Sequence, residues 1–125
     1  MNGFLRMLVF VALTVPAVAA CAAPTAKAQR EIDGLIAALG GSGCKFERNG
    51  SWHDAKAARA HLQKKYDYLR KRGMADTAEF FIERGASKSS MSGKPYRVRC
   101  PGKAVDTATH WFEQRLRTLR AAPAA

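Results

Sequence analysis

The segment that decides the fold reads Cys44-Lys45-Phe46-Glu47-Arg48-Asn49-Gly50-Ser51-Trp52-His53. Its first half alternates in polarity, which predicts a strand with Cys44 and Phe46 facing the core. Asn49-Gly50 is the strongest two-residue signal for a tight turn, because both residues accept a positive φ. Residues 51–53 then form a very short return strand, so the segment predicts a β-hairpin.

A second alternating run, Tyr96-Arg97-Val98-Arg99-Cys100, follows much later in the chain. Tyr96, Val98 and Cys100 share one face of this predicted strand, and the two arginines occupy the other. A polar loop precedes the run, and Pro101-Gly102 ends it. The chain therefore has a third strand with the same alternation as the hairpin.

Apolar residues spaced by three and four predict helices around these strands. We expect helices over residues 30–39 and 55–72, a short helix that ends at Arg84, and a final helix capped by Asp106 or Thr107. Asp54 is the N-cap of the long helix, and Asp76-Thr77-Ala78-Glu79 matches a capping box that opens the short one. The predicted fold class is α+β: one domain over residues 30–121, with a small antiparallel sheet of two or three short strands against about four helices.

The first residues have the pattern of a bacterial secretory signal. Arg6 is the only charge in residues 1–20, an apolar run follows it at 7–15, and small residues lead into Cys21. Residues 7–23 are at the lower edge of the length of a membrane span and are weakly apolar in their second half, so a cleaved leader is favoured over a retained anchor. We assign residues 1–20 to a signal peptide, residues 21–29 to a tether, and the protein to the periplasm.

The cleavage point is left open by the residues. Val18-Ala19-Ala20-Cys21 resembles a lipobox, after which Cys21 would carry a lipid and anchor the protein to the outer membrane. Cleavage after Ala19 or after Ala28 would instead leave a soluble periplasmic protein.

In an oxidising compartment the other two cysteines are expected to form a disulfide. Cys44 and Cys100 are an isolated pair once Cys21 is set aside, and such a pair is read as a disulfide in an exported protein. The bridge would place the first and third strands close together. Closing a loop of this length stabilises a small domain by about 4 kcal/mol.

The chain is strongly basic, with 21 Lys or Arg residues against 10 Asp or Glu residues and a formal net charge of +11. Such a balance would suggest nucleic acid for a cytosolic protein, but the leader directs this one to the envelope. We expect anionic envelope components as partners, namely lipid head groups, lipopolysaccharide or wall polymer, or else an envelope protein. No nucleic acid is expected.

A serine-rich loop is the first candidate site. Its hydroxyls, backbone amides and lysines are what an anion site needs, although it matches neither a P-loop nor a Ser-x-x-Lys motif. The alternative is a turn whose serines satisfy loop backbone groups. The residues of this candidate anion-binding loop are Ser87, Lys88, Ser89, Ser90 and Lys94.

Catalysis has little support in the sequence. His53, His61 and His110 have no spacing that suggests a metal site, and no cofactor is expected. His61 lies beside the apolar stripe of the long helix, so the alternative function is a small hydrolase that uses a serine of residues 87–92 with His61. Trp52 and Tyr68 remain free for stacking on sugars, because Tyr66 and Trp111 occupy core positions.

Several short motifs resemble the YfeK-like family of small exported bacterial proteins, which is defined by a domain of unknown function. The resemblance covers residues 31–119 and implies an envelope location and one small domain, with no activity to carry over. Arg48, His61 and Tyr96 lie within its motifs and are candidate functional residues. The motifs are Arg48-Asn49-Gly50, Ala58 with His61-Leu62, Thr77-Ala78-Glu79-Phe80 with Ile82, Ala86-Ser87, Ser89-Ser90, Gly93-Lys94-Pro95-Tyr96 and Val98.

Taken together, the residues predict an uncharacterised envelope protein that is a basic binding or interaction module and not an enzyme. The basic charge, the leader and the missing catalytic constellation support this hypothesis over the hydrolase.

Overall fold

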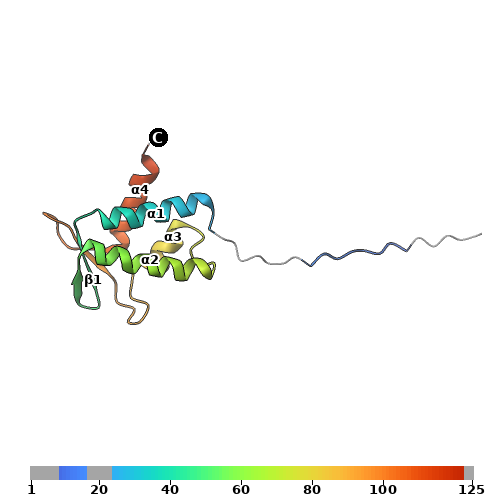
Figure 1. Ribbon diagram of the computed structural model, residues 1–125, viewed down its shortest axis with the longest axis horizontal. Coiled ribbons are helices and arrows are strands. Elements are labelled where there is room, and N and C mark those ends of the chain that lie inside the picture. Colours follow the sequence, from blue (N-terminus) through green and yellow to red (C-terminus); the bar gives the residue numbers. More distant parts are fainter. Residues whose placement is uncertain (1–8, 17–23, 123–125) are drawn as a thin grey trace, which may run out of the picture.

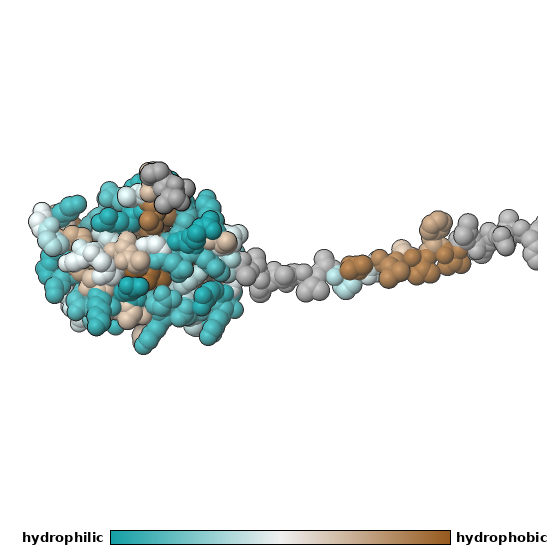
Figure 2. All heavy atoms as spheres, turned by 45° about the horizontal axis from the view of Figure 1, so that its top comes forward, coloured by the Kyte–Doolittle hydropathy of each residue, from teal (hydrophilic) through white to brown (hydrophobic). Residues whose placement is uncertain are grey.

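The computed structural model describes residues 9–16 and 24–122. Most of the predicted leader, and Cys21 with it, lies outside these residues. Residues 9–16 form no helix or strand, and their apolar side chains are exposed, as the brown spheres outside the domain show (Figure 2). In the described part of the chain, no helix is both long and apolar enough to cross a membrane.

The fold is α+β, as predicted, with four α-helices and a four-stranded antiparallel sheet of order β2-β1-β3-β4. In chain order the elements are α1 (Ala26–Gly40), β1 (Lys45–Arg48), β2 (Ser51–His53), α2 (Ala55–Lys71), α3 (Ala78–Phe81), a π-helical turn η1 (Ile82–Ala86), β3 (Arg97–Arg99), β4 (Asp106–Thr107) and α4 (Ala108–Ala121). The sheet has one strand more than expected. β4 is only two residues long and has no periodicity that a sequence pattern would show.

The predicted hairpin is confirmed. Asn49 and Gly50 turn the chain with φ values of 50° and 83°, which is the left-handed conformation that a two-residue hairpin requires. The Cys44–Cys100 disulfide is also present, with the two Cα atoms 4.2 Å apart. Lys45 pairs with Arg99 across β1 and β3, so the flanking cysteines lie opposite each other at the end of the strand pair.

The first helix begins earlier than predicted. α1 begins at Ala26, not at Arg30, because the Thr25 hydroxyl accepts a hydrogen bond of 3.1 Å from the Ala28 amide. Threonine is a good N-cap, and Ala28 is buried. Residues 26–29, which the sequence places in the tether, are therefore the first turn of the domain.

The capping box before α3 is shifted by one residue. Thr77, not Asp76, is the N-cap, and its hydroxyl accepts from the Phe80 amide at 3.1 Å. The Glu79 carboxylate does not return to the cap but forms an ion pair with Arg120 of α4, 2.6 Å away. The helical segment also continues past Arg84, as the π-helical turn η1.

Helices α1, α2 and α4 pack around one core, and the sheet lies at one end of them (Figure 1). Residues that pair directly across antiparallel strands share a face of the sheet. Phe46 and Val98 are such a pair and are buried toward the helices. Lys45, Arg97 and Arg99 have the opposite parity and are exposed, so the sheet has a covered inner face and an open outer face.

Candidate functional site

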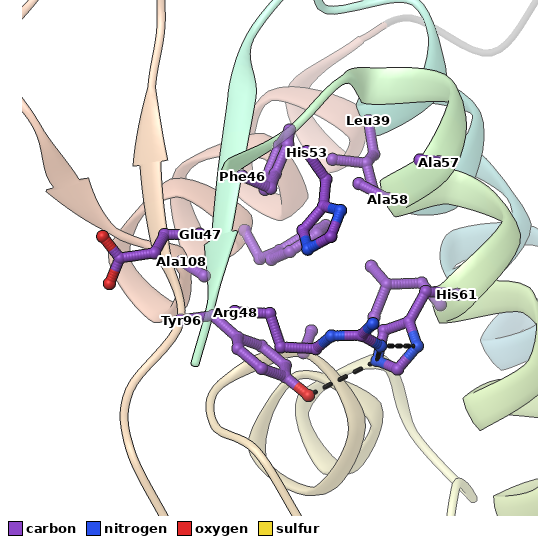
Figure 3. A pocket seen from close by; sticks show the side chains of 13 residues that line it. Leu39, Phe46, Glu47, Arg48, His53, Ala57, Ala58, His61, Tyr96 and Ala108 are labelled. Atoms are coloured by element: carbon purple, nitrogen blue, oxygen red, sulfur yellow. Dashed lines mark hydrogen bonds between the residues drawn. The ribbon is translucent and has the colours of Figure 1, made fainter. Parts of the chain in front are cut away.

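A pocket of about 120 Å³ lies where the inner face of the sheet meets α1, α2 and α4. Most of its wall is apolar, and Arg48, His61 and Tyr96 lie together on one side of it, whereas His53 lies apart from them near Phe46 and Ala58 (Figure 3). The lining residues come from α1, β1, β2, α2, η1 and α4 and from Tyr96 just before β3: Leu39, Phe46, Glu47, Arg48, His53, Ala57, Ala58, His61, Leu62, Ala86, Tyr96, Ala108 and Phe112.

Three of the candidate functional residues meet at this pocket. Nη1 of Arg48 lies 2.5 Å from Nδ1 and 3.1 Å from Nε2 of His61. The Tyr96 hydroxyl lies 3.4 Å from Nε2 of the same ring. Arg48 ends β1, His61 is on α2, and Tyr96 precedes β3, so the tertiary structure brings together side chains that are far apart in the sequence. Figure 3 shows the three side by side.

Lys65 completes the cluster and was missed in the sequence. Its ammonium group donates to the Tyr96 hydroxyl at 3.2 Å and to the Lys88 carbonyl oxygen at 3.3 Å. The signal was available, because Lys65 is four residues after His61 on α2 and such residues share a helix face. The basic cluster is therefore Arg48, His61, Lys65 and Tyr96.

Burial and positive charge govern the ionisation of this cluster. Burial first, and then the positive charges of Arg48 and Lys65, lower the pKa of His61 to about 4. The pKa of Lys65 is also lowered, first by burial and then by Arg48, whereas burial raises the pKa of Tyr96. At neutral pH, His61 is a neutral ring that accepts a hydrogen bond from Arg48.

The two cations of the cluster have no acidic partner. Residues 24–122 contain four ion pairs of arginine with carboxylates and one contact of His110 with Asp106, and none of these five contacts includes Arg48 or Lys65. Glu47 is adjacent in sequence, but its carboxylate points away from the pocket (Figure 3) and pairs with Arg97 on the outer face. Burying a cation without a counter-ion costs free energy. A negatively charged group bound at this part of the pocket would reduce that cost.

The lowered pKa of His61 predicts a pH dependence of stability. Between about pH 6.5 and 4 the unfolded chain binds a proton at this residue and the folded one does not, so acidification favours unfolding. We expect the free energy of unfolding to fall by about 2 kcal/mol across this window, after a discount for partial exposure. Urea denaturation at a series of pH values measures the loss.

The matched control is His61→Gln, which keeps a neutral hydrogen-bonding group but does not titrate. Its stability should be flat between pH 6.5 and 4.5. Below that, both proteins should lose stability, because hydrogen bonds from Arg120 lower the pKa of Glu31 and of Glu79. An equal slope for both proteins between pH 6.5 and 4.5 would contradict the assignment to His61.

The serine loop is held by its own hydroxyl groups. Ser87 donates to the Ile82 carbonyl oxygen at 2.6 Å, and the buried Ser89 hydroxyl accepts from the backbone amides of Met91 and Ser92 at 3.3 Å. The side-chain amide of Asn49 also donates to Ser89, which ties the loop to the hairpin turn. Ser87 and Ser89 thus have structural partners, as the turn interpretation expects.

The remaining residues of that loop are on the surface. Lys88, Ser90 and Lys94 are exposed, and their role in binding an anion stays a prediction. The hydrogen bonds of His61 go to Arg48 and Tyr96 and not to a serine of the loop. No group of three His, Cys, Asp or Glu side chains that could hold a metal ion occurs in the described ranges.

The two aromatic residues predicted to be free each have an arginine guanidinium beside the ring. The Arg72 guanidinium lies 3.6 Å from the ring centroid of Tyr68. Trp52 has Arg99 at 4.5 Å and Arg97 at 5.7 Å from its ring. A sugar that stacked on the same ring face as these guanidinium groups would have to displace them. Tyr66 and Trp111 are buried in the core, as expected.

Comparison with known proteins gives a family without an activity. Residues 26–120 match the model of a family described as "Family of unknown function (DUF5329)". The uncharacterized protein YfeK of Salmonella typhimurium is 49% identical over 51 residues, which cover 41% of this chain and 41% of that protein. The resemblance to YfeK-like proteins is thereby confirmed. No solved structure matches the chain.

Proposed function

Because the chain belongs to the DUF5329 family, whose function is unknown, we propose a function from the pocket itself: the protein is a non-enzymatic module that binds a small amphiphilic anion. The observation that carries this proposal is a pair of half-buried cations, Arg48 and Lys65, without a carboxylate partner beside an apolar pocket. A carboxylate or phosphate group supplies the missing charge.

The head group of the ligand would be held by the donors of the basic cluster. Arg48 contacts the His61 ring, and the Tyr96 hydroxyl lies within hydrogen-bond distance of both that ring and the Lys65 ammonium. Arg48, Lys65 and Tyr96 can each donate to an anion. His61 is neutral at pH 7, so the site does not carry a third positive charge whose burial would cost free energy. Each charge-assisted hydrogen bond of this kind contributes about 1.5–3 kcal/mol.

The apolar part of the ligand would enter the pocket. Leu39, Phe46, Leu62 and Phe112 supply a wall without charge. An apolar cavity of about 150 Å³ accommodates benzene, so this pocket has room for an apolar group of roughly four to six carbon atoms. Its size favours a short alkyl or ring-bearing anion over a bulky one.

We also propose that the domain works in the cell envelope, either soluble in the periplasm or anchored through a lipid on Cys21. The leader pattern supports this location, and the Cys44–Cys100 disulfide agrees with it, because such bonds persist in oxidising compartments.

Titration with simple anions tests the pocket. Hexanoate is expected to bind about tenfold more tightly than butyrate at pH 7, because two further methylene groups are buried at about 0.8 kcal/mol each. Arg48→Gln and Lys65→Gln should each weaken hexanoate at least about tenfold. Chemical-shift titration or calorimetry measures these affinities, with hexan-1-ol as the uncharged analogue.

Lys64→Gln is the matched control, since Lys64 is exposed, adjacent to Lys65 on α2, and carries the same charge. It should leave hexanoate binding within about twofold of the wild type, because an exposed charge outside the cluster is screened by solvent. The proposal would be wrong if hexan-1-ol bound as tightly as hexanoate, or if Lys64→Gln weakened binding as much as Lys65→Gln.

A further inference from the structure

We propose that the outer face of the sheet docks on the surface of an anionic lipid bilayer. This surface is separate from the pocket, which opens on the inner face. Lys45 and Glu47 alternate with the core residue Phe46 on β1 and therefore lie on the outer face. The residues that pair with them across the strands lie on the same face. The outer face consists of Lys45, Glu47, Trp52, Arg97, Arg99 and Thr107.

The first observation is a like-charge pair across two strands. Lys45 on β1 is directly opposite Arg99 on β3, and like charges in that position repel each other and destabilise the sheet. Neither residue has a carboxylate partner within residues 24–122. The repulsion is relieved when both cations contact negative charges outside the domain.

The second observation is the way in which the outer face presents its arginines. Arg99 and Arg97 flank the ring of Trp52, and an ion pair with Arg97 neutralises Glu47, the only acid of the face. A planar guanidinium binds phosphate oxygens in pairs. Tryptophan is enriched at the level of lipid head groups because its ring is amphipathic.

These contacts favour a lipid surface over a wall glycan. A glycan binder stacks sugars on an open aromatic face, but the ring of Trp52 is already occupied by arginines. Beside the patch, the exposed Lys103 and Val105 precede β4 and add a cation and an apolar side chain of the kind that enters a head-group layer. The partner that fits is a phospholipid surface with net negative charge.

The fluorescence of Trp52 tests the proposal in the full chain. The chain has two tryptophans, and Trp111 is only 8% exposed, so a change on vesicle binding reports Trp52 and not the leader, which has none. We expect a shift to shorter wavelength with vesicles of phosphatidylcholine and phosphatidylglycerol, and no shift with phosphatidylcholine alone. The shift should disappear near 1 M salt, where the screening length is about 3 Å.

The decisive variant is Lys45→Gln with Arg99→Gln. Each cation near an anionic membrane contributes about a fivefold change in partitioning, so the double variant should bind the anionic vesicles about twentyfold more weakly. Its thermal midpoint should equal or exceed that of the wild type, since the repulsion across the strands is gone. Quenching of Trp52 by brominated phosphatidylglycerol in the wild type is a second measurement that needs no variant.

The charge-matched control is Lys64→Gln with Arg117→Gln, two exposed cations on helices away from this face. It should bind the vesicles nearly as the wild type does. Equal losses in both double variants, a Trp52 shift with neutral vesicles, absence of quenching, or a larger shift with an anionic wall polymer than with vesicles would each overturn the proposal. None of these outcomes bears on the pocket, which hexanoate tests separately.

Discussion

Replacement of both Cys44 and Cys100 by alanine is expected to lower the free energy of unfolding by about 4 kcal/mol. The bond joins residues 56 positions apart, so its loss frees a long loop in the unfolded chain. Small domains have a total stability of about 5–15 kcal/mol, so the variant should be close to unfolding at moderate temperature. Guanidinium denaturation of both proteins under non-reducing conditions measures the difference.

Reduction provides the control for this variant. A reducing agent should destabilise the wild type by a similar amount and leave the alanine variant unchanged. Equal stabilities of the oxidised wild type and the variant would contradict the assigned contribution. Alkylation of thiols in intact cells also tests location: protein that reacts at Cys44 and Cys100 would contradict the proposed envelope compartment.

Phe81→Ala is expected to lower the free energy of unfolding by about 3–5 kcal/mol. Phe81 ends α3 with no exposed surface, and its ring packs edge-on against Tyr66 of α2 with the centroids 5.7 Å apart. Its ring also lies beside Gly85, where an added Cβ would be 3.2 Å away. Removal of the ring leaves a cavity between α2 and η1. Chemical denaturation measures the loss.

Phe80→Ala is the matched control for this substitution. Phe80 is the neighbouring residue of the same type, but it is 37% exposed and its ring contacts the Arg84 guanidinium at 4.2 Å. We expect a loss of about 1 kcal/mol or less, since surface contacts of this kind contribute little. Similar losses for both variants would show that burial does not explain the effect of Phe81.

The pocket and the outer face use the two sides of one small sheet. Alternation along β1 places Phe46 and Arg48 toward the helices and Lys45 and Glu47 on the outer face of the sheet. On the opposite side of the core, Arg120 forms ion pairs with both Glu31 and Glu79, and these join α4 to α1 and α3. The basic charge of the chain is thus divided between structural pairs and cations without acidic partners, and the proposed sites include Arg48, Lys65, Lys45 and Arg99 from the second group.

Local sequence patterns determined the elements of this fold. The alternation in β1 and β3, the Asn49-Gly50 turn and the cap at Asp54 are interactions between near neighbours, and a near-neighbour interaction can be read from adjacent residues. The cysteine pair added the one long-range contact that the sequence predicted. The errors are equally local: Thr25 and Thr77 were competing caps, and β4 is too short to have a period.

The sequence by itself also determined three members of the basic cluster as candidates, but only the tertiary structure decided that Arg48, His61 and Tyr96 touch one another and that Lys65 joins them. It also decided which cations lack acidic partners. The physical reason is that charge and burial depend on distances between segments. Those distances are set by the packing of α2 against the sheet, and a pattern within a single segment does not contain them.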